Sequence, residues 1–436
     1  MLVILICIVL LILLVSWAKV NPFLAFLMVS ITAGLLLGIP LTKITASVQK
    51  GLGDTLGPLA IIICLGAMLG KLVATSGAAQ KIAEVLVNLF GVKHIQLALV
   101  AVGFIIGIPL FYNTGFVLMV PLIFSVVYKY KLPAVYIGLP MLSALSVTHG
   151  FLPPHPSPTT LVGMFHADMG TTLLYGLALA IPAIILAGPV FAQTLKKMPS
   201  APLDTFRSED MPADKLPGTA TSFLTALLPV ILLMASTFYL NSNKTPGRMH
   251  DIITFLGDAP IVMLISLLVA TFTLGLRQKK TMTALGGIYT DAVKDISMIL
   301  LIIAGAGAFK QVLVDSGINN EITSLLQSSH MQPLVLGWLL AAIIRISLGS
   351  ATVAGLTAAG IVSTMVLKDP TINPNLMVLS IGAGSLACSH VNDGGFWLFK
   401  EYFNLSIKNT FLSWTVMETL VALIGLGGVL ILNMFV

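Results

Sequence analysis

The chain has 436 residues, of which 57% are hydrophobic and only 9% are charged. A soluble domain carries about 25% charged residues, so this composition excludes a soluble enzyme and indicates an all-α polytopic membrane protein. The formal net charge of +6 is explained by Lys and Arg gathered in cytoplasmic loops. No basic cluster interleaved with aromatic residues indicates a nucleic-acid partner.

Apolar segments long enough to cross about 30 Å of hydrocarbon recur along the chain. They are expected near residues 2–18, 22–39, 58–75, 172–193, 222–240, 258–276, 296–313 and 412–435. The first segment has no basic leader region and no small-residue cleavage site. We therefore predict a membrane span there and not a signal peptide.

Four further apolar segments are interrupted. Residues 95–128 and 334–367 are broken in the middle, which predicts two re-entrant hairpins. Residues 133–165 and 376–403 begin as helices and run into prolines, glycines and polar residues, which predicts two broken helices. The sequence thus predicts about ten transmembrane spans, two re-entrant hairpins and two broken helices.

Loop charges predict an orientation. The strongest basic groups, at 128–131, 196–197 and 277–280, are assigned to the cytoplasm, whereas residues 314–333 contain no Lys or Arg and are assigned to the periplasm. When the predicted spans are placed between these segments, both termini lie on the periplasmic side of a bacterial inner membrane.

A polar, proline-containing segment at 198–220 divides the chain. We interpret it as a solvated cytoplasmic linker between a first transmembrane repeat, residues 1–197, and a second, residues 221–436.

The two halves match at an offset of about 240 residues. The matching pairs are Gly66–Lys71 with Gly305–Lys310, Ser76–Gly77 with Ser316–Gly317, Pro109–Asn113 with Gly349–Val353, and Ser146–His149 with Ala387–His390. Each half has five spans, an odd number, so the second half is predicted to be inverted relative to the first. Inverted repeats with interrupted helices are typical of secondary transporters, whose sites lie where the breaks meet.

Polar residues concentrate at these four breaks, where backbone groups freed from the helix need partners. We predict substrate contacts at Tyr112, Asn113, Thr114, Thr148, His149, Gly150, Gly349, Ser350, Thr352, Ser389 and Asn392. We predict proton coupling at His149, His390 and Asp393, because ionisable residues inside a membrane are functional candidates and histidine titrates near neutral pH. A substrate carboxylate would face the helix N-termini at the breaks.

Structural roles remain open for several of these residues. His149 and His390 could cap the breaks by bonding freed carbonyl groups. Asp393 could pair with Arg345 or Lys400. Lys71 and Lys310 are expected to extend to a membrane interface and not to a ligand.

No metal or cofactor is expected. Cys7, Cys64 and Cys388 are scattered in apolar segments and form no ligand pattern. An intramembrane metalloenzyme is an alternative, because His149 and His155 are six residues apart and His390 and Asp393 three apart, but there is no His-Glu-x-x-His helix. A passive channel, which needs rings of polar residues along several spans, is a second alternative.

The break motifs resemble those of the gluconate permease family of sugar-acid:proton symporters. The resemblance rests on Thr148–Gly150 with Pro153–Pro156, Gly349–Ala354, Ser389–Asp393 with Gly395–Trp397, Lys400–Phe403 and Trp414–Thr419. It covers nearly the whole chain. It implies proton-coupled import of gluconate or a related hydroxy acid, with re-entrant hairpins and an elevator-like movement. The implied partners are a small organic anion, a coupling proton and the lipid bilayer; a homo-oligomer is left open.

The chain departs from the family pattern at two positions. Asn113 stands where the family commonly has an acidic residue, and Leu348 where it commonly has Gln. An amide cannot carry a proton, although it can bond a hydroxylated solute. A carrier of D-serine, glycerate or a ketogluconate, or a sodium-coupled carrier, therefore remains an alternative.

Overall fold

The computed structural model describes residues 2–107, 112–153, 155–206, 211–243, 247–317 and 331–436. Within these residues the protein is helical and contains no strand. Seven described helices are long and apolar enough to cross a membrane, and one bent pair would make an eighth. The prediction of an all-α polytopic membrane protein is confirmed, and the number of ten spans stays a prediction.

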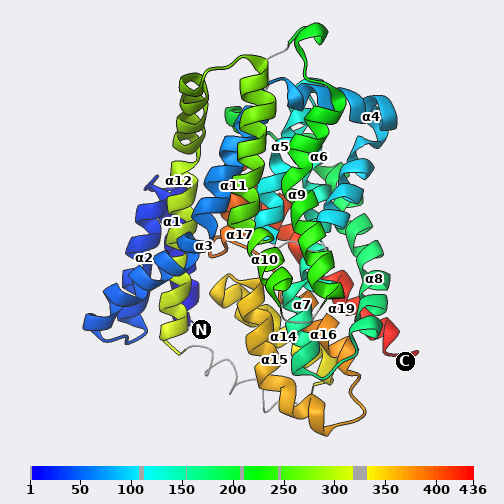
Figure 1. The fold of residues 1–436 in the computed structure, drawn as a ribbon. Helices are drawn as coiled ribbons and strands as arrows, with labels where there is room; N and C mark the ends of the chain where they lie inside the picture. Colours follow the sequence, from blue (N-terminus) through cyan, green and yellow to red (C-terminus); the bar gives the residue numbers. More distant parts are fainter. Residues whose placement is uncertain (1, 108–111, 154, 207–210, 244–246, 318–330) are drawn as a thin grey trace.

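The helices pack as two groups (Figure 1). The first bundle consists of α1 (Leu2–Ser16), α2 (Pro22–Leu36), α3 (Leu41–Thr75), α9 (Thr219–Ser242), α10 (Arg248–Leu256), α11 (Ala259–Ala270) and α12 (Met282–Asp315). The second bundle consists of α4 (Ala78–Gly107), α5 (Tyr112–Tyr130), α6 (Ala134–Phe151), α7 (Pro156–Met164), α8 (Met169–Ile185), α14 (Pro333–Leu348), α15 (Ala351–Lys368), α16 (Pro374–Gly384), α17 (Gly394–Tyr402), α18 (Ile407–Thr410) and α19 (Val416–Leu432).

Helices α3 and α12 pack along each other and form the spine of the first bundle. With 35 and 34 residues they are about 50 Å long, longer than the predicted spans, because the more polar residues before those spans are helical too. Their contact depends on small residues. A Cβ on Gly51 would lie 2.4 Å from the carbonyl oxygen of Gly307, and one on Gly307 would lie 2.0 Å from Thr55 Oγ1.

The predicted interruptions are present wherever the chain is described. Helix α6 ends at an extended Leu152, and α7 starts after His155, whose ring accepts a hydrogen bond from the Ser157 amide. Between α16 and α17 the chain leaves the helix, and Asp393 caps α17. Gly349, at φ +70°, separates α14 from α15. The tip of the first hairpin, residues 108–111, lies outside the described residues.

One bend is not predicted from the sequence. Helix α4 turns by 112° between Ala78–Gly91 and His94–Ile105, with Gly91 at φ +71°. The first arm of the predicted hairpin at 95–128 is therefore preceded by a separate helical arm.

The predicted cytoplasmic groups gather at one end of the molecule. The Tyr128 hydroxyl donates to the Pro202 carbonyl at 2.5 Å, and Gln278 donates to the Ser76 carbonyl at 3.3 Å. Both termini lie at the opposite end, at the bottom of Figure 1.

The linker differs from the solvated loop that we expect from its composition. Thr205 is only 3% exposed and donates a 2.5 Å hydrogen bond to Asp295 of α12. Gln80 of α4 exchanges two hydrogen bonds with the Met211 backbone, at 3.0 and 2.9 Å. The linker therefore packs on both bundles.

Candidate functional site

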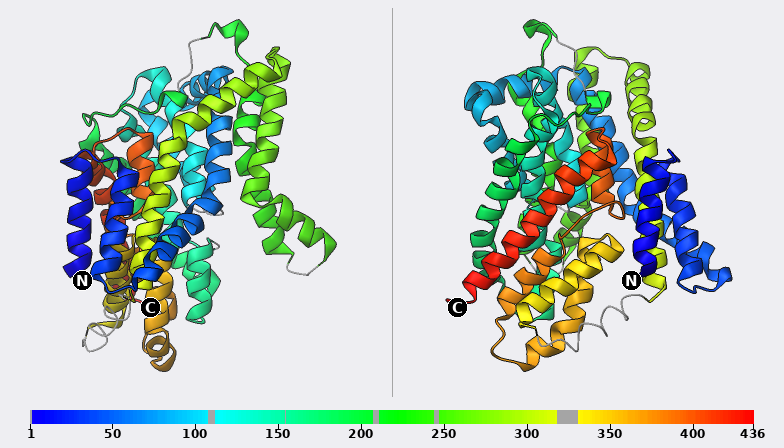
Figure 2. Two further views of the ribbon diagram at one scale, coloured as in Figure 1. Left: turned by 90° about the vertical axis from the view of Figure 1, so that its left-hand side faces the viewer. Right: turned by 180° about the vertical axis from the view of Figure 1, so that it is seen from behind.

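A polar cavity of about 210 Å³ lies where the breaks meet, and both bundles line it. Helices α3 and α12 of the first bundle, whose ribbons run side by side (Figure 2), supply residues such as Thr55 and Lys310 to its lining. Eight predicted site residues line the cavity: Tyr112, Asn113, His149, Gly349, Ser350, Thr352, Asn392 and Asp393. The breaks far apart in sequence are therefore brought together, as the repeat pattern predicts.

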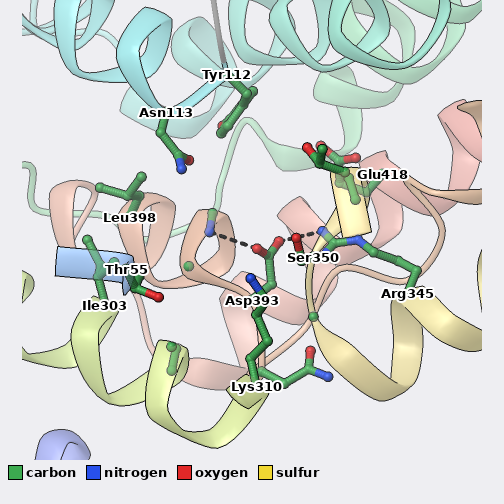
Figure 3. Close-up of a pocket in the computed structure, with 18 of the residues that line it drawn as sticks. Thr55, Tyr112, Asn113, Ile303, Lys310, Arg345, Ser350, Asp393, Leu398 and Glu418 are labelled. Carbon is green, nitrogen blue, oxygen red and sulfur yellow. Dashed lines mark hydrogen bonds and ion pairs between the residues drawn. The ribbon is translucent and has the colours of Figure 1, made fainter. Parts of the chain in front are cut away.

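The centre of the cavity is an ion pair between α14 and the start of α17 (Figure 3). Arg345 Nη2 donates to Asp393 Oδ2 at 2.5 Å, and the two side chains are 4% and 14% exposed. Asp393 also accepts from the Ser389 hydroxyl and, at 3.0 Å, from the Gly395 amide. Asp393 therefore pairs with Arg345, one of its two predicted partners. The other, Lys400, pairs with Glu401 at 2.8 Å.

Arg345 has donor capacity that the protein does not use. Its Nε and Nη1 atoms are buried and have no hydrogen-bond partner among the described residues. A buried guanidinium is costly to keep without full pairing. Nε and Nη1 lie on different edges of the guanidinium group, so each can donate to a separate acceptor.

The segment before α17 is fastened to the end of α14. Asn392 donates to the carbonyl oxygens of Ile346 and Ser347, at 2.7 and 3.2 Å, and His390 Nε2 bonds the Ile346 oxygen at 2.9 Å. A Cβ on Gly349 would lie 2.1 Å from the Asn392 carbonyl oxygen. His390 therefore has the capping geometry, and Asn392 Oδ1 remains without a partner among the described residues.

His149 meets His155 across the first broken helix, with Nδ1 and Nε2 3.2 Å apart. Because His155 Nδ1 accepts from the Ser157 amide, a neutral His155 carries its hydrogen on Nε2 and donates it to His149 Nδ1. A neutral His149 then carries its own hydrogen on Nε2 and can donate to a solute.

Glu418 of α19 is a second acid in the cavity wall. It is 2% exposed, and its Oε2 accepts a 2.8 Å hydrogen bond from the Ser146 hydroxyl of α6. No Lys, Arg or His of the described chain lies within ion-pair distance of Glu418.

Lys310 differs from its sequence expectation. It lies on α12, lines the cavity instead of reaching an interface, and points towards Asp393 in Figure 3. Lys71, which we also expect at an interface, pairs with Asp295 at 2.8 Å.

Four predicted site residues do not line the cavity: Thr148, Gly150, Ser389 and His390. Thr148 bonds the Leu145 carbonyl of its own helix at 2.8 Å. Gly150 allows α6 to approach Gly382 of α16. Ser389 accepts from Trp414 Nε1 at 2.8 Å and so orients Asp393. The side chain of Thr114 lies outside the described residues.

Six other polar or aromatic cavity residues are not among the predicted site residues: Thr55, Ser146, Lys310, Arg345, Trp414 and Glu418. Arg345 and Glu418 carry a signal in the sequence, because each is an ionisable residue within an apolar segment. Thr55 carries none, since only the crossing of α3 and α12 brings it to the cavity.

The metal alternative gains no support. In the part of the chain that the structure describes, no group of three His, Cys, Asp or Glu residues could hold a metal ion.

The whole chain can be compared with known proteins. The profile of the GntP family permease matches residues 1–435. A high-affinity gluconate transporter of Escherichia coli (strain K12) is 46% identical over 430 residues, 98% of each chain. The chain belongs to the GntP permease family.

Other relatives agree with this membership. A gluconate permease of Bacillus licheniformis is 44% identical over the full length of both chains. The Gnt-II system L-idonate transporter of Escherichia coli (strain K12) is 44% identical over 97% of each chain. The family prediction is confirmed, and with it the prediction that this GntP permease is a transporter and not an enzyme.

Proposed function

We propose that this GntP permease imports gluconate, or a closely related hydroxylated monocarboxylate, together with protons across the bacterial inner membrane. The observation that carries the proposal is Arg345, which lines the cavity and has two buried nitrogen atoms without a partner among the described residues. The gluconate and L-idonate transporters among its relatives supply the class of anion. The carboxylate would accept a hydrogen bond from the Arg345 guanidinium beside Asp393.

Other groups suit a chain of hydroxyls. The Tyr112 hydroxyl is buried without a partner among the described residues. Asn113, Ser350 and Thr352 line the same cavity and can both donate and accept hydrogen bonds. Helices α5 and α15 begin at the cavity, and their N-termini favour an anion there. These groups support a small polyhydroxy acid as the solute.

The two bundles suggest how the site could be exposed to each side in turn. Thr55 and Lys310 reach the cavity from the first bundle, and Arg345, Asp393 and Glu418 from the second. A sliding of the second bundle against α3 and α12 would carry most of the site across the membrane. We therefore retain the elevator-like movement as part of the proposal.

The order of elements supports the proposed repeat of residues 1–197 and 221–436. In each half a long helix, α3 or α12, is followed by a hairpin and then by a broken helix. The periplasmic position of both termini belongs to the same proposal.

Substrate class can be tested by exchange in proteoliposomes. Vesicles loaded with unlabelled gluconate should take up labelled gluconate, and external L-idonate should compete with it. Competition and uptake with D-serine, together with no exchange of gluconate, would contradict the sugar-acid assignment and favour the amino-acid alternative.

A further inference from the structure

We propose that Glu418 carries the coupling proton of this transporter. The proposal rests on the proposed function and names the residue that links proton and solute at the same site. It is argued from the hydrogen bonds and the charges around the cavity.

Glu418 has the surroundings of a group that exchanges a proton. It lines the cavity, and among the described residues its carboxyl group has one hydrogen bond, from Ser146. It has no cationic partner among the described residues. An unpaired buried carboxylate is costly, and one proton removes that cost.

The facing groups leave Glu418 as the acid that is free to change its charge. Helix α19 packs against α6, α8, α14 and α16 and against the π-helical turns at 186–190 and 411–415. The titratable residues that share the cavity wall with Glu418 are Tyr112, His149, Lys310, Arg345 and Asp393. Asp393 is held by Arg345, the Ser389 hydroxyl and the Gly395 amide. His149 is engaged by His155 on one ring nitrogen.

This arrangement explains how proton and solute could bind together. An ionised Glu418 places a negative charge in the cavity beside Arg345, where it repels the carboxylate of the solute. A proton from the outer solution binds the Glu418 carboxylate, removes that charge and leaves Arg345 available to the solute. The same proton leaves to the inner solution after the solute has dissociated. Each ligand therefore favours binding of the other.

The test compares Glu418→Gln with Glu401→Gln in proteoliposomes. Glu401 lies at the end of α17, outside the cavity, and pairs with Lys400. With an acidic exterior, we expect Glu418→Gln to accumulate at least tenfold less gluconate than the wild type. Exchange of gluconate without a gradient should persist. Glu401→Gln should keep both.

A pH-sensitive dye gives a second readout. Gluconate added to the weakly buffered, purified wild-type protein should cause proton uptake, and Glu418→Gln should show none. Accumulation by Glu418→Gln at the wild-type level would overturn the proposal. So would loss of gluconate exchange, because Glu418 would then be a solute contact or a structural residue. Failure of the wild type to exchange gluconate at all would instead reject the proposed function.

Discussion

Arg345 places a full positive charge inside an apolar helix, where a charged side chain costs several kcal/mol unless it is paired. Asp393 compensates for this charge through one nitrogen atom, Nη2. The other two nitrogens are buried without partners among the described residues. A carboxylate that accepts from the guanidinium would add a second anionic partner, so the site suits an anion of this class.

Substitution of Arg345 by Lys tests this assignment. The variant keeps the charge opposite Asp393, but it loses the additional guanidinium N–H donors that a carboxylate could use. A lost hydrogen bond to a charged group is worth about 1.5–3 kcal/mol, so the Kd for gluconate should rise about 10- to 100-fold. Isothermal titration of the purified protein measures this change.

Arg277→Lys, in the basic loop after α11, is the matched control and should leave the Kd unchanged. An unaltered Kd in Arg345→Lys would show that the carboxylate binds elsewhere.

At single positions, sequence and structure agree where a break in an apolar helix coincides with a polar residue. Asn113, Ser350 and Asn392 were predictable in this way, and all three line the cavity. Thr148 and Ser389 stand in the same breaks, yet they bond Leu145 and Asp393. The direction of a side chain depends on how the neighbouring helices pack, and a local sequence pattern does not reveal that packing.

Among the helices, α6 and α16 approach each other unusually closely. A Cβ on Gly382 would lie 2.1 Å from the Gly150 carbonyl oxygen. Gly150 and Gly382 lie in buried helices, and the atom that a new Cβ on Gly382 would meet belongs to the backbone. A change of side-chain rotamer could therefore not relieve the clash. This contact holds the two broken helices together beneath the cavity.

Gly382→Ala should therefore destabilise the protein. Overpacking of a buried contact costs about 1–3 kcal/mol, and scanning fluorimetry in detergent should show a lower melting temperature. Gly360→Ala in α15 is the control, because among the described residues its Cβ position meets nothing within 4 Å apart from the adjacent backbone of its own helix. Equal melting temperatures for the two variants would contradict the proposed role of this contact.

The elements were predictable to different degrees. The two broken helices and the second hairpin have strong signals in prolines and glycines, and the structure has breaks there. The bend at Gly91 was not predicted, because a single glycine in an apolar segment is compatible with a straight helix. The lengths of α3 and α12 were underestimated, because their polar ends are not required to cross the membrane.

Over the whole molecule, the cavity lies where the two bundles meet, and α3 packs against α5 and α12 against α17 at this boundary. Ile303 of α12 and Gly394 at the start of α17 meet across this boundary, with 3.7 Å between Ile303 Cγ2 and the Cβ position of Gly394. Cysteines at these two positions would face each other across the boundary, and we choose them for an engineered disulfide. Such a link would fix the bundles relative to each other.

With the three native cysteines replaced, the oxidised Ile303→Cys, Gly394→Cys protein should lose uptake, and reduction should restore it. Gly34→Cys with Ile44→Cys joins α2 to α3 within the first bundle and should permit uptake when oxidised. Uptake at the unmodified rate by the first protein in its crosslinked form would exclude sliding of one bundle against the other.

The central claim is proton-coupled import of gluconate, and gradient-driven uptake in proteoliposomes tests it most directly. Labelled gluconate is offered under a pH gradient, acidic outside, and separately under an inward sodium gradient. We predict accumulation above the external concentration with the pH gradient and none with sodium alone. Accumulation driven by sodium, or no accumulation of gluconate under either gradient, would contradict the account.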